Sequence, residues 1–394
     1  YAVTAPKGGV QGDGVARLSS HASKKRPASA NREQAKQDDQ RSPHHTSSCG
    51  SATLTLPCAV ARLPPRLSID RNPESHMAIL RIQHIGVVVR DLEAACAHFE
   101  RTLGLQARDF RDDQGRGMQL DARVLLGNEC WLHLVQNWNP ESRVFRFLEE
   151  KGEGLEHIAL ETDDIEADVA HLREIGVPIW EDRILDANDG YEAFVFPDQL
   201  PGLTVELIQS HDRSWFYPPE QVSGPISSTM ELVRLQHIGL VVEDLQDACA
   251  KFERLFALQA QDFRDDQGKG KQLDARILFP NQCWLHLVQN WDPESRVNRF
   301  LDSRGEGLDH IAIRSRDVQH DVARFRDDGV SFFEDTVFDA NDGLEAFLYP
   351  DELPGMTVEL IQPHNDSWTF PDEAARAKPS DESDPRTPTL PTHT

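Results

Sequence analysis

The hydrophobic pattern of the chain becomes regular at Gln83–Val89, a β-rich run. Asp91 then offers a helix N-cap, and a helical period follows over Leu92–Leu103 until Gly104, a typical helix stop. Three short strands are predicted next, near Gln106–Phe110, Asp121–Leu126 and Cys130–Gln136. This stretch therefore predicts a strand, a helix and three further strands.

The same order of elements starts again at Leu155–Leu160. Asp163 and Asp164 form the next helix cap, and Ile165–Glu174 has the helical period. Strands are predicted near Ile179–Asp182, Ala193–Phe196 and Thr204–Ile208. The second stretch is thus another strand-helix-three-strand unit.

Both units are duplicated further along the chain at an offset of 153 residues. Phe110–Gly115 recurs as Phe263–Gly268, Cys130–Trp138 as Cys283–Trp291, and Val205–Gln209 as Val358–Gln362. We therefore expect an α+β fold of four βαβββ units that form two domains with cupped mixed sheets. The expected domains are residues 77–218 and 232–371, joined by a linker at 219–231.

Residues 1–76 and 372–394 lack sustained apolar periodicity and are expected to be disordered tails. The first segment is rich in Ser, Pro, Ala and basic residues and starts with Tyr1, whereas Met77 precedes the first strand. One interpretation is that Met77 is the true start and that residues 1–76 do not belong to the native protein. An organelle transit peptide is the rival interpretation of this segment.

A spacing of 49 residues links two metal-capable side chains in every unit. A His lies on the first strand, and a His or Glu lies on the last strand. The four pairs are His84 with His133, His157 with Glu206, His237 with His286, and His310 with Glu359. If the units pair about a pseudo-twofold axis, three imidazoles and one carboxylate converge in each domain.

Strand alternation places each of these side chains on one face of its strand. Ile82, His84 and Gly86 are expected to share a face, and Val205 and Leu207 to point away from Glu206. A buried Glu at that position is costly unless a partner or a cation compensates it. The alternatives are solvent-facing positions on an open sheet, or core histidines with hydrogen-bond partners.

A donor set of imidazole and carboxylate suits Zn, Ni, Co, Mn or Fe, and we expect about one divalent ion per domain. An ion that accepts six ligands would leave positions for a bidentate substrate.

Charge and composition exclude other classes of function. The chain has 41 Lys+Arg against 66 Asp+Glu, a net charge of −25, which gives no reason to expect nucleic-acid binding. No apolar run approaches the roughly 20 residues that cross a bilayer. The six Cys form no CxxC pair, and four of them are duplicated positions, so a reducing cytoplasmic compartment is expected.

The paired units, with His on the first strand and Glu on the last, resemble the vicinal oxygen chelate superfamily, which includes glyoxalase I, extradiol dioxygenases and bleomycin-resistance proteins. The segments His84–Val89, Gly152–Ala159 and Asp163–Ala167 look most like methylmalonyl-CoA epimerase. The resemblance implies metal ligands at His84, His157 and Glu206, with His133 where relatives place Gln or Glu. It also implies a second acid/base carboxylate, for which Asp113 and, in the second copy, Asp266 are the nearest candidates.

The expected activity is proton abstraction α to a carbonyl through a metal-stabilised enolate, with Glu206 or Glu359 as one acid/base group. The substrate would be a small molecule, an acyl-CoA or a glutathione adduct. Candidate substrate-binding residues are Trp131 and Arg143, with Trp284 and Arg296 in the second copy, although core packing and a solvated helix start account for them equally well. The protein is expected to be a monomer or a homodimer.

Three alternative functions stay open at this stage. Glyoxalase I shares the ligand set and the enediolate chemistry. An extradiol dioxygenase would need Fe(II) with positions open for O2, and His133 as a fourth ligand argues against it. A bleomycin-resistance-like binding protein would use the same cup without metal or catalysis.

Overall fold

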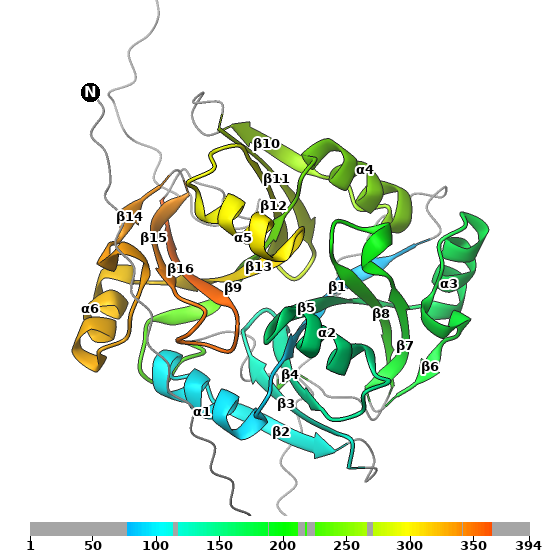
Figure 1. Cartoon of the computed structure of the whole chain (residues 1–394), viewed down its shortest axis with the longest axis horizontal. Coiled ribbons are helices and arrows are strands. Elements are labelled where there is room, and N and C mark those ends of the chain that lie inside the picture. The colour runs from blue at the N-terminus through cyan, green and yellow to red at the C-terminus, as the bar shows by residue number, and fades with distance from the viewer. Residues whose placement is uncertain are drawn as a thin grey trace, which may run out of the picture. The chain divides into compact units, whose positions relative to one another are not determined.

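The computed structural model describes residues 77–112, 117–187, 189–211, 217–218, 225–265, 271–340 and 342–364. Two eight-stranded mixed sheets, each curled and flanked by helices, make up this part of the chain (Figure 1). The predicted α+β fold of four βαβββ units in two domains is therefore confirmed. The expected tails lie outside the described residues. No helix of the described ranges is long and apolar enough to span a membrane.

The described part of the first copy contains eight strands and three α-helices. They are β1 Ile79–Val88, α1 Leu92–Leu103, β2 Ala107–Asp112, β3 Gln119–Leu125, β4 Trp131–Asn137, α2 Arg143–Lys151, β5 Gly154–Thr162, α3 Ile165–Glu174, β6 Leu185–Asp186, β7 Gly190–Val195 and β8 Thr204–Ser210. The second copy repeats them. They are β9 Leu232–Val241, α4 Leu245–Phe256, β10 Gln261–Asp265, β11 Gln272–Phe279, β12 Cys283–Asn290, α5 Arg296–Arg304, β13 Gly307–Ser315, α6 Val318–Asp328, β14 Phe338–Asp339, β15 Gly343–Leu348 and β16 Thr357–Pro363.

Each sheet joins the two units of one copy through their opening strands. The strand order in the first copy is β2-β3-β4-β1-β5-β8-β7-β6, with β1 antiparallel to β5 and parallel to β4. Strand β5 is likewise parallel to β8. The opening and closing strands of both units are therefore the four central strands of the sheet, and each copy builds its own site. The second sheet has the same order.

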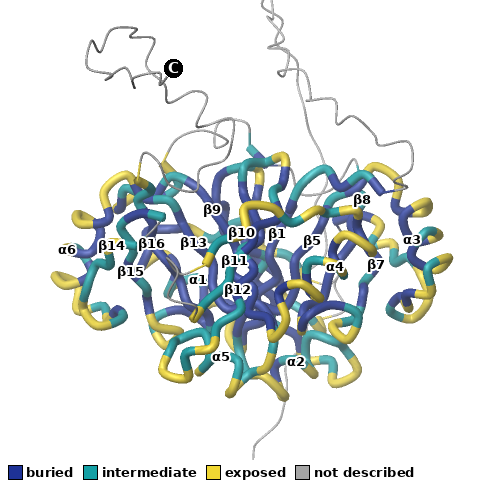
Figure 2. Tube along the Cα trace, turned by 90° about the horizontal axis from the view of Figure 1, so that it is seen from above, coloured by how far each residue is buried: buried dark blue, intermediate teal, exposed yellow. Residues whose placement is uncertain are grey.

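Helices α1 and α3 begin and end where the sequence pattern predicts. The side chain of Asp91 accepts a hydrogen bond from the backbone N–H of Ala94, and Gly104 ends α1 with a φ of 65°, in the left-handed region that glycine adopts without strain. Phe99 and Leu103 on the buried face of α1 join the apolar core beneath the sheet. Figure 2 shows this burial pattern, since the central strands are buried and the exposed positions gather on helices and loops.

A β-bulge changes the expected face alternation on β1. The pairing of β1 with β5 shifts register between Ile82 and His84, and Ile82 packs in the apolar core together with Ile85 and Val87. The prediction that Ile82 shares a face with His84 is therefore wrong, because the extra residue of the bulge reverses the alternation.

One further local prediction differs from the structure. The strand expected near Ile179–Asp182 is a single 3-10 turn, Trp180–Asp182, in which Glu181 has a φ of 52°. The sheet instead gains the two-residue strand β6 at Leu185–Asp186. Helix α2 begins at Arg143, where a helix start was one interpretation of the sequence, and the Ser142 side chain caps it by accepting from the N–H of Phe145.

The two copies pack against each other through reciprocal contacts. The Asn128 Nδ2 donates to the carbonyl of Leu235 at 2.9 Å, and the Asn281 Nδ2 donates to the carbonyl of Ile82 at 2.9 Å. The two contacts are equivalent, because Asn281 and Leu235 lie 153 residues after Asn128 and Ile82, the offset between the copies. The duplicated chain thus supplies both halves of a pseudo-twofold interface.

Candidate metal centre

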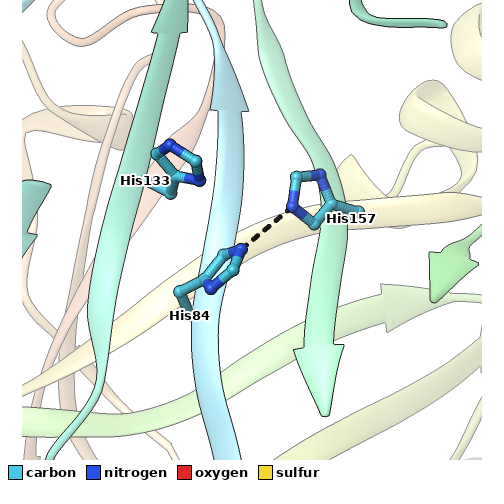
Figure 3. Close-up of side chains that lie close together, drawn as sticks. All are labelled: His84, His133 and His157. Carbon is cyan, nitrogen blue, oxygen red and sulfur yellow. Dashed lines mark hydrogen bonds between the residues drawn. The ribbon is translucent and has the colours of Figure 1, made fainter. Parts of the chain in front are cut away.

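Three histidines from three neighbouring strands meet on the concave face of the first sheet. His84 comes from β1, His133 from β4 and His157 from β5, and one ring nitrogen of each lies within 4.8 Å of the other two. Figure 3 shows the three rings facing a common space. The Nε2 atoms of His84 and His157 are 3.2 Å apart. The strand pairing causes this convergence, since His84 is paired with Trp131, next but one to His133, and His157 is paired with Gly86.

Glu206 on β8 adds a carboxylate to this cluster. Its Oε2 lies 3.4 Å from the Nε2 of His84 and 3.2 Å from the Nε2 of His157. Neighbouring ligands about 2.0–2.2 Å from one ion are themselves roughly 3.0–3.6 Å apart, so these three donor atoms have the spacing of an ion site. The residue is 3% exposed, and its Oε1 has no hydrogen-bond partner within the described residues. A buried, partly unsatisfied carboxylate beside three imidazoles fits a divalent cation.

The second copy repeats this geometry. The Nε2 atoms of His237 and His310 are 3.2 Å apart, and they lie 3.5 and 3.3 Å from the Oε2 of Glu359. The rings of His237, His286 and His310 form the corresponding cluster. All eight predicted ligands are therefore brought together as two groups of four.

Hydrogen bonds behind the rings turn the Nε2 atoms toward the site. The Nδ1 of His84 lies 2.9 Å from the Gln83 side-chain oxygen, and the Nδ1 of His157 lies 2.7 Å from the carboxylate of Glu156. Arg143 at the start of α2 forms a salt bridge with that carboxylate. Gln236, Asp309 and Arg296 make the same contacts in the second copy. Such partners fix the ring orientation of metal-ligating histidines.

The electrostatics of the cluster favour the ligating forms of His84 and Glu206. For His157 and His133, burial acts to lower the pKa, but nearby carboxylates outweigh it and the net pKa is raised. Burial lowers the pKa of His84 to about 4, although Glu206 opposes this effect. Burial acts to raise the pKa of Glu206, but His84 and the hydrogen bonds with His157 outweigh it, and the net pKa lies below the usual value. His84 is therefore neutral and Glu206 ionised at neutral pH, the protonation states in which both can hold a cation.

A cavity of about 450 Å³ opens above the first cluster. Its walls carry four further carboxyl side chains, Asp121, Asp186, Asp189 and Glu192. The Asp121 carboxylate lies 3.3 Å from the Nε2 of His133, and Asp189 pairs with Arg111 at 2.5 Å. The corresponding cavity of the second copy is smaller, about 220 Å³. The first site is thus the roomier of the two.

The remaining predicted site residues lie in different environments. Trp131 is buried and stacks on His84, with ring centroids 5.9 Å apart, and Trp284 does the same with His237 at 5.7 Å. We therefore expect these indoles to support the ligand rings rather than to contact a substrate. Arg143 and Arg296 do line the two cavities, each paired with the carboxylate behind a ligand. Asp113 and Asp266 lie outside the described residues.

Sequence reasoning did not single out Gln83, Glu156 and Glu192 as site residues. A signal for the first two was present, because a Gln or an acidic residue directly precedes each strand-borne histidine of the opening strands in both copies. Glu192 gives no such signal: it is one acidic residue on a short strand, and only the fold places it in the cavity.

Comparisons with known proteins agree with this geometry. The model of the glyoxalase/bleomycin resistance protein/dioxygenase superfamily matches residues 83–196 and again 236–349. An ethylmalonyl-CoA/methylmalonyl-CoA epimerase of Cereibacter sphaeroides is 30% identical over 133 residues, which are 33% of this chain and 97% of the relative. The mitochondrial methylmalonyl-CoA epimerase of Bos taurus is 28% identical over 159 residues, 40% of this chain and 90% of the relative.

A solved structure extends the likeness over both copies. A mutant of 4-hydroxymandelate synthase from Streptomyces coelicolor superimposes with a TM-score of 0.56 at 18% identity, covering 76% of this chain and 97% of that one. At this identity the match concerns the fold alone. The two family matches, the repeated His-Glu clusters and the shared fold lead to one conclusion: the chain belongs to the glyoxalase/bleomycin resistance protein/dioxygenase superfamily, as a tandem duplication.

Proposed function

We propose that the protein is a divalent-metal-dependent enzyme that moves a proton at a carbon α to a carbonyl, with methylmalonyl-CoA epimerase-like activity. The observation that carries the proposal is the cluster of three imidazoles and one ionised carboxylate at the base of an open cavity. The epimerase names of the relatives supply the reaction class. His84, His133, His157 and Glu206 would hold the ion, as would their counterparts in the second copy. A divalent ion bound there acts as a Lewis acid that stabilises negative charge on substrate oxygens.

Epimerisation needs one group to take a proton and another to return it to the opposite face of the carbon. Glu206 is the first candidate, since its Oε2 faces the histidines while its Oε1 has no partner in the described part of the chain. Glu192, from the adjacent strand β7, is the described carboxyl group that best suits the second role. Asp113 and Asp266 stay predictions for the same role.

The surroundings shift the pKa values of the two carboxyl groups in opposite directions. Burial raises the pKa of Glu192 well above its usual value, and the charge of Glu206 acts in the same direction. Two carboxyl groups in a single cavity whose pKa values are pushed apart are a common arrangement for an acid and a base. Glu345 repeats this arrangement next to Glu359 in the second copy.

Replacing Glu192 by Gln is expected to lower kcat while leaving the metal content unchanged. Loss of a positioned acid/base group costs on the order of 10²–10⁴-fold in rate. Steady-state epimerisation kinetics and metal analysis of the same preparation test this expectation, with Glu345→Gln as the matched variant in the smaller cavity. An unchanged kcat in the Glu192→Gln, Glu345→Gln double variant would assign the second role to another residue, Asp113 first.

The function as a whole is tested by metal analysis followed by three assays on one preparation. Purified protein from metal-replete cells should hold about two divalent ions per chain and should exchange the α-proton of methylmalonyl-CoA with solvent deuterium. Isomerisation of a glutathione hemithioacetal without that exchange would favour a glyoxalase I, and oxygen uptake with catechols would favour a dioxygenase. Metal-free protein that binds small molecules without turnover would be a binding protein of the bleomycin-resistance kind.

A further inference from the structure

A third cavity, besides those above the two metal clusters, lies at the junction of the two copies. Its volume is about 360 Å³, and residues of α2, β5 and the loops beside β8 line it together with residues of α5 and β13. Figures 1 and 2 show α2 and α5 as neighbours at this junction. We call it the inter-copy cavity. A single copy cannot form it, because Phe300 and Arg304 of the second copy complete its wall.

Aromatic rings provide much of the inner surface of the inter-copy cavity. Trp180 and Phe196 lie with ring centroids 5.5 Å apart, at an interplanar angle of 43°. Phe147 on α2 and Phe300 on α5 complete the aromatic lining, and all four side chains are half-buried. Partly exposed aromatic walls of this kind offer stacking surfaces to a planar ring.

Cationic side chains stand beside these rings. The Arg146 guanidinium lies 5.4 Å from the centroid of the Trp180 ring, and its hydrogen bond goes to the carbonyl of Glu141. Lys151 and Arg304 donate to each other's backbone carbonyls at 2.7 and 2.6 Å. Carboxylates neutralise none of these three cations through an ion pair in the described part of the chain. In a protein of net charge −25, this group is a local positive site.

Acidic residues also line the inter-copy cavity, and two of the three have partners. Glu156 is paired with Arg143, and the Glu306 carboxylate accepts a hydrogen bond from the backbone N–H of Glu243 at 2.8 Å. Glu150 is the third and is exposed on α2. With Glu156 offset by Arg143, the cations outnumber the remaining acids by one.

We propose that the inter-copy cavity binds a planar aromatic group that carries a phosphate or a carboxylate. The ring would stack on Trp180, and the anion would meet Arg146 and Lys151. Arg143 lines both this cavity and the metal-site cavity, and its partner Glu156 holds the Nδ1 of His157. A ligand in the inter-copy cavity would therefore lie next to Arg143 and Glu156, the two residues that hold the ring of His157.

Two sources of such a ligand share this chemistry. One is the nucleotide end of an acyl-CoA substrate, a source that rests on the proposed function. The other is a separate aromatic anion that binds independently of the reaction. The binding test below needs no activity, so failure of the proposed function and failure of this proposal are distinguishable.

Isothermal titration of the full chain with adenosine 3′,5′-bisphosphate tests the binding site, with inorganic phosphate as the probe that lacks a ring. Arg146→Ala and Trp180→Ala are each expected to weaken bisphosphate binding by about tenfold or more, the scale of one cation–π or stacking contact. Trp180→Phe keeps a ring and should retain most of the affinity. Arg299→Ala, the corresponding change in the second copy, should have no effect. Equal affinity in all variants, no measurable binding, or equally tight binding of inorganic phosphate would overturn the proposal.

Kinetics of the Arg146→Ala variant then identify the source. If the nucleotide end of the substrate occupies the cavity, KM rises for methylmalonyl-CoA but not for methylmalonyl-pantetheine. If both KM values stay unchanged while bisphosphate affinity falls, a separate aromatic anion is the ligand. Unchanged metal content in each variant shows that the substitutions have not disturbed the neighbouring site.

Discussion

Replacing Glu206 by Ala is expected to reduce the metal content from about two ions per chain to about one and to remove most of the activity. The substitution deletes the one carboxylate donor of the first cluster, whose Oε2 lies 3.2–3.4 Å from two histidine nitrogens. It also removes the proposed proton acceptor, a loss on the order of 10²–10⁴-fold in rate at that site. The effect on activity should be larger than that of Glu359→Ala, because the first cavity is about 450 Å³ and the second about 220 Å³.

The two single variants, Glu206→Ala and Glu359→Ala, and the double variant test this expectation, because each single variant keeps one intact site as a control. Metal analysis by plasma mass spectrometry should give about one ion per chain for either single variant and none for the double variant. Epimerisation rates should fall steeply in Glu206→Ala and modestly in Glu359→Ala. Two ions retained in Glu206→Ala would refute its role as a ligand, and equal losses of rate would show that cavity volume does not decide which site turns over.

The architecture was readable from the sequence because the duplication repeats each signal. The 49-residue spacing between ligands recurs four times, and strand alternation puts Val205 and Leu207 in the apolar core, on the opposite face of the strand from Glu206. The caps Asp91 and Asp164 fix the starts of α1 and α3 by local hydrogen bonds, so these helices begin where predicted. Helix caps and ligand spacings that recur at a fixed offset can therefore be recognised from one sequence alone.

The parts that were missed depend on contacts between distant segments. The bulge at Ile82 is a property of the pairing of β1 with β5, which no local pattern records. Glu192 becomes a cavity residue only because β7 pairs with β8, and the inter-copy cavity exists only once α2 and α5 are neighbours. Helix α2 has nine residues, and Leu148 is its one buried residue, so the sequence pattern indicated a helix start at Arg143 but not the extent of the helix.

Gly86 is the position where the smallest change should have a large effect. A Cβ atom placed on this residue would lie 1.9 Å from the Cε1 of His157 and 2.1 Å from its Nδ1, well inside any real contact distance. The backbone of β1 passes directly under the imidazole, so only glycine leaves room for the ring. Gly86→Ala is therefore expected to displace His157, to remove the ion of the first site and to abolish its activity. Gly239→Ala, where the Cβ would lie 2.0 Å from the Cε1 of His310, should do the same to the second site alone.

A double variant separates the steric effect on the ring from a general effect on the strand. Overpacking a buried position typically costs about 1–3 kcal/mol, and Gly86→Ala should lower the free energy of unfolding of the metal-free protein by this amount. Deleting the imidazole removes the obstacle, so Gly86→Ala combined with His157→Ala should be more stable than the sum of the two single changes predicts, as a double-mutant cycle in urea can measure. Metal binding at the first site should stay lost in the double variant, because the ligand is gone. Additive effects on stability would mean that the new methyl group is accommodated elsewhere, and the close approach of β1 to His157 would then not be what positions this ligand.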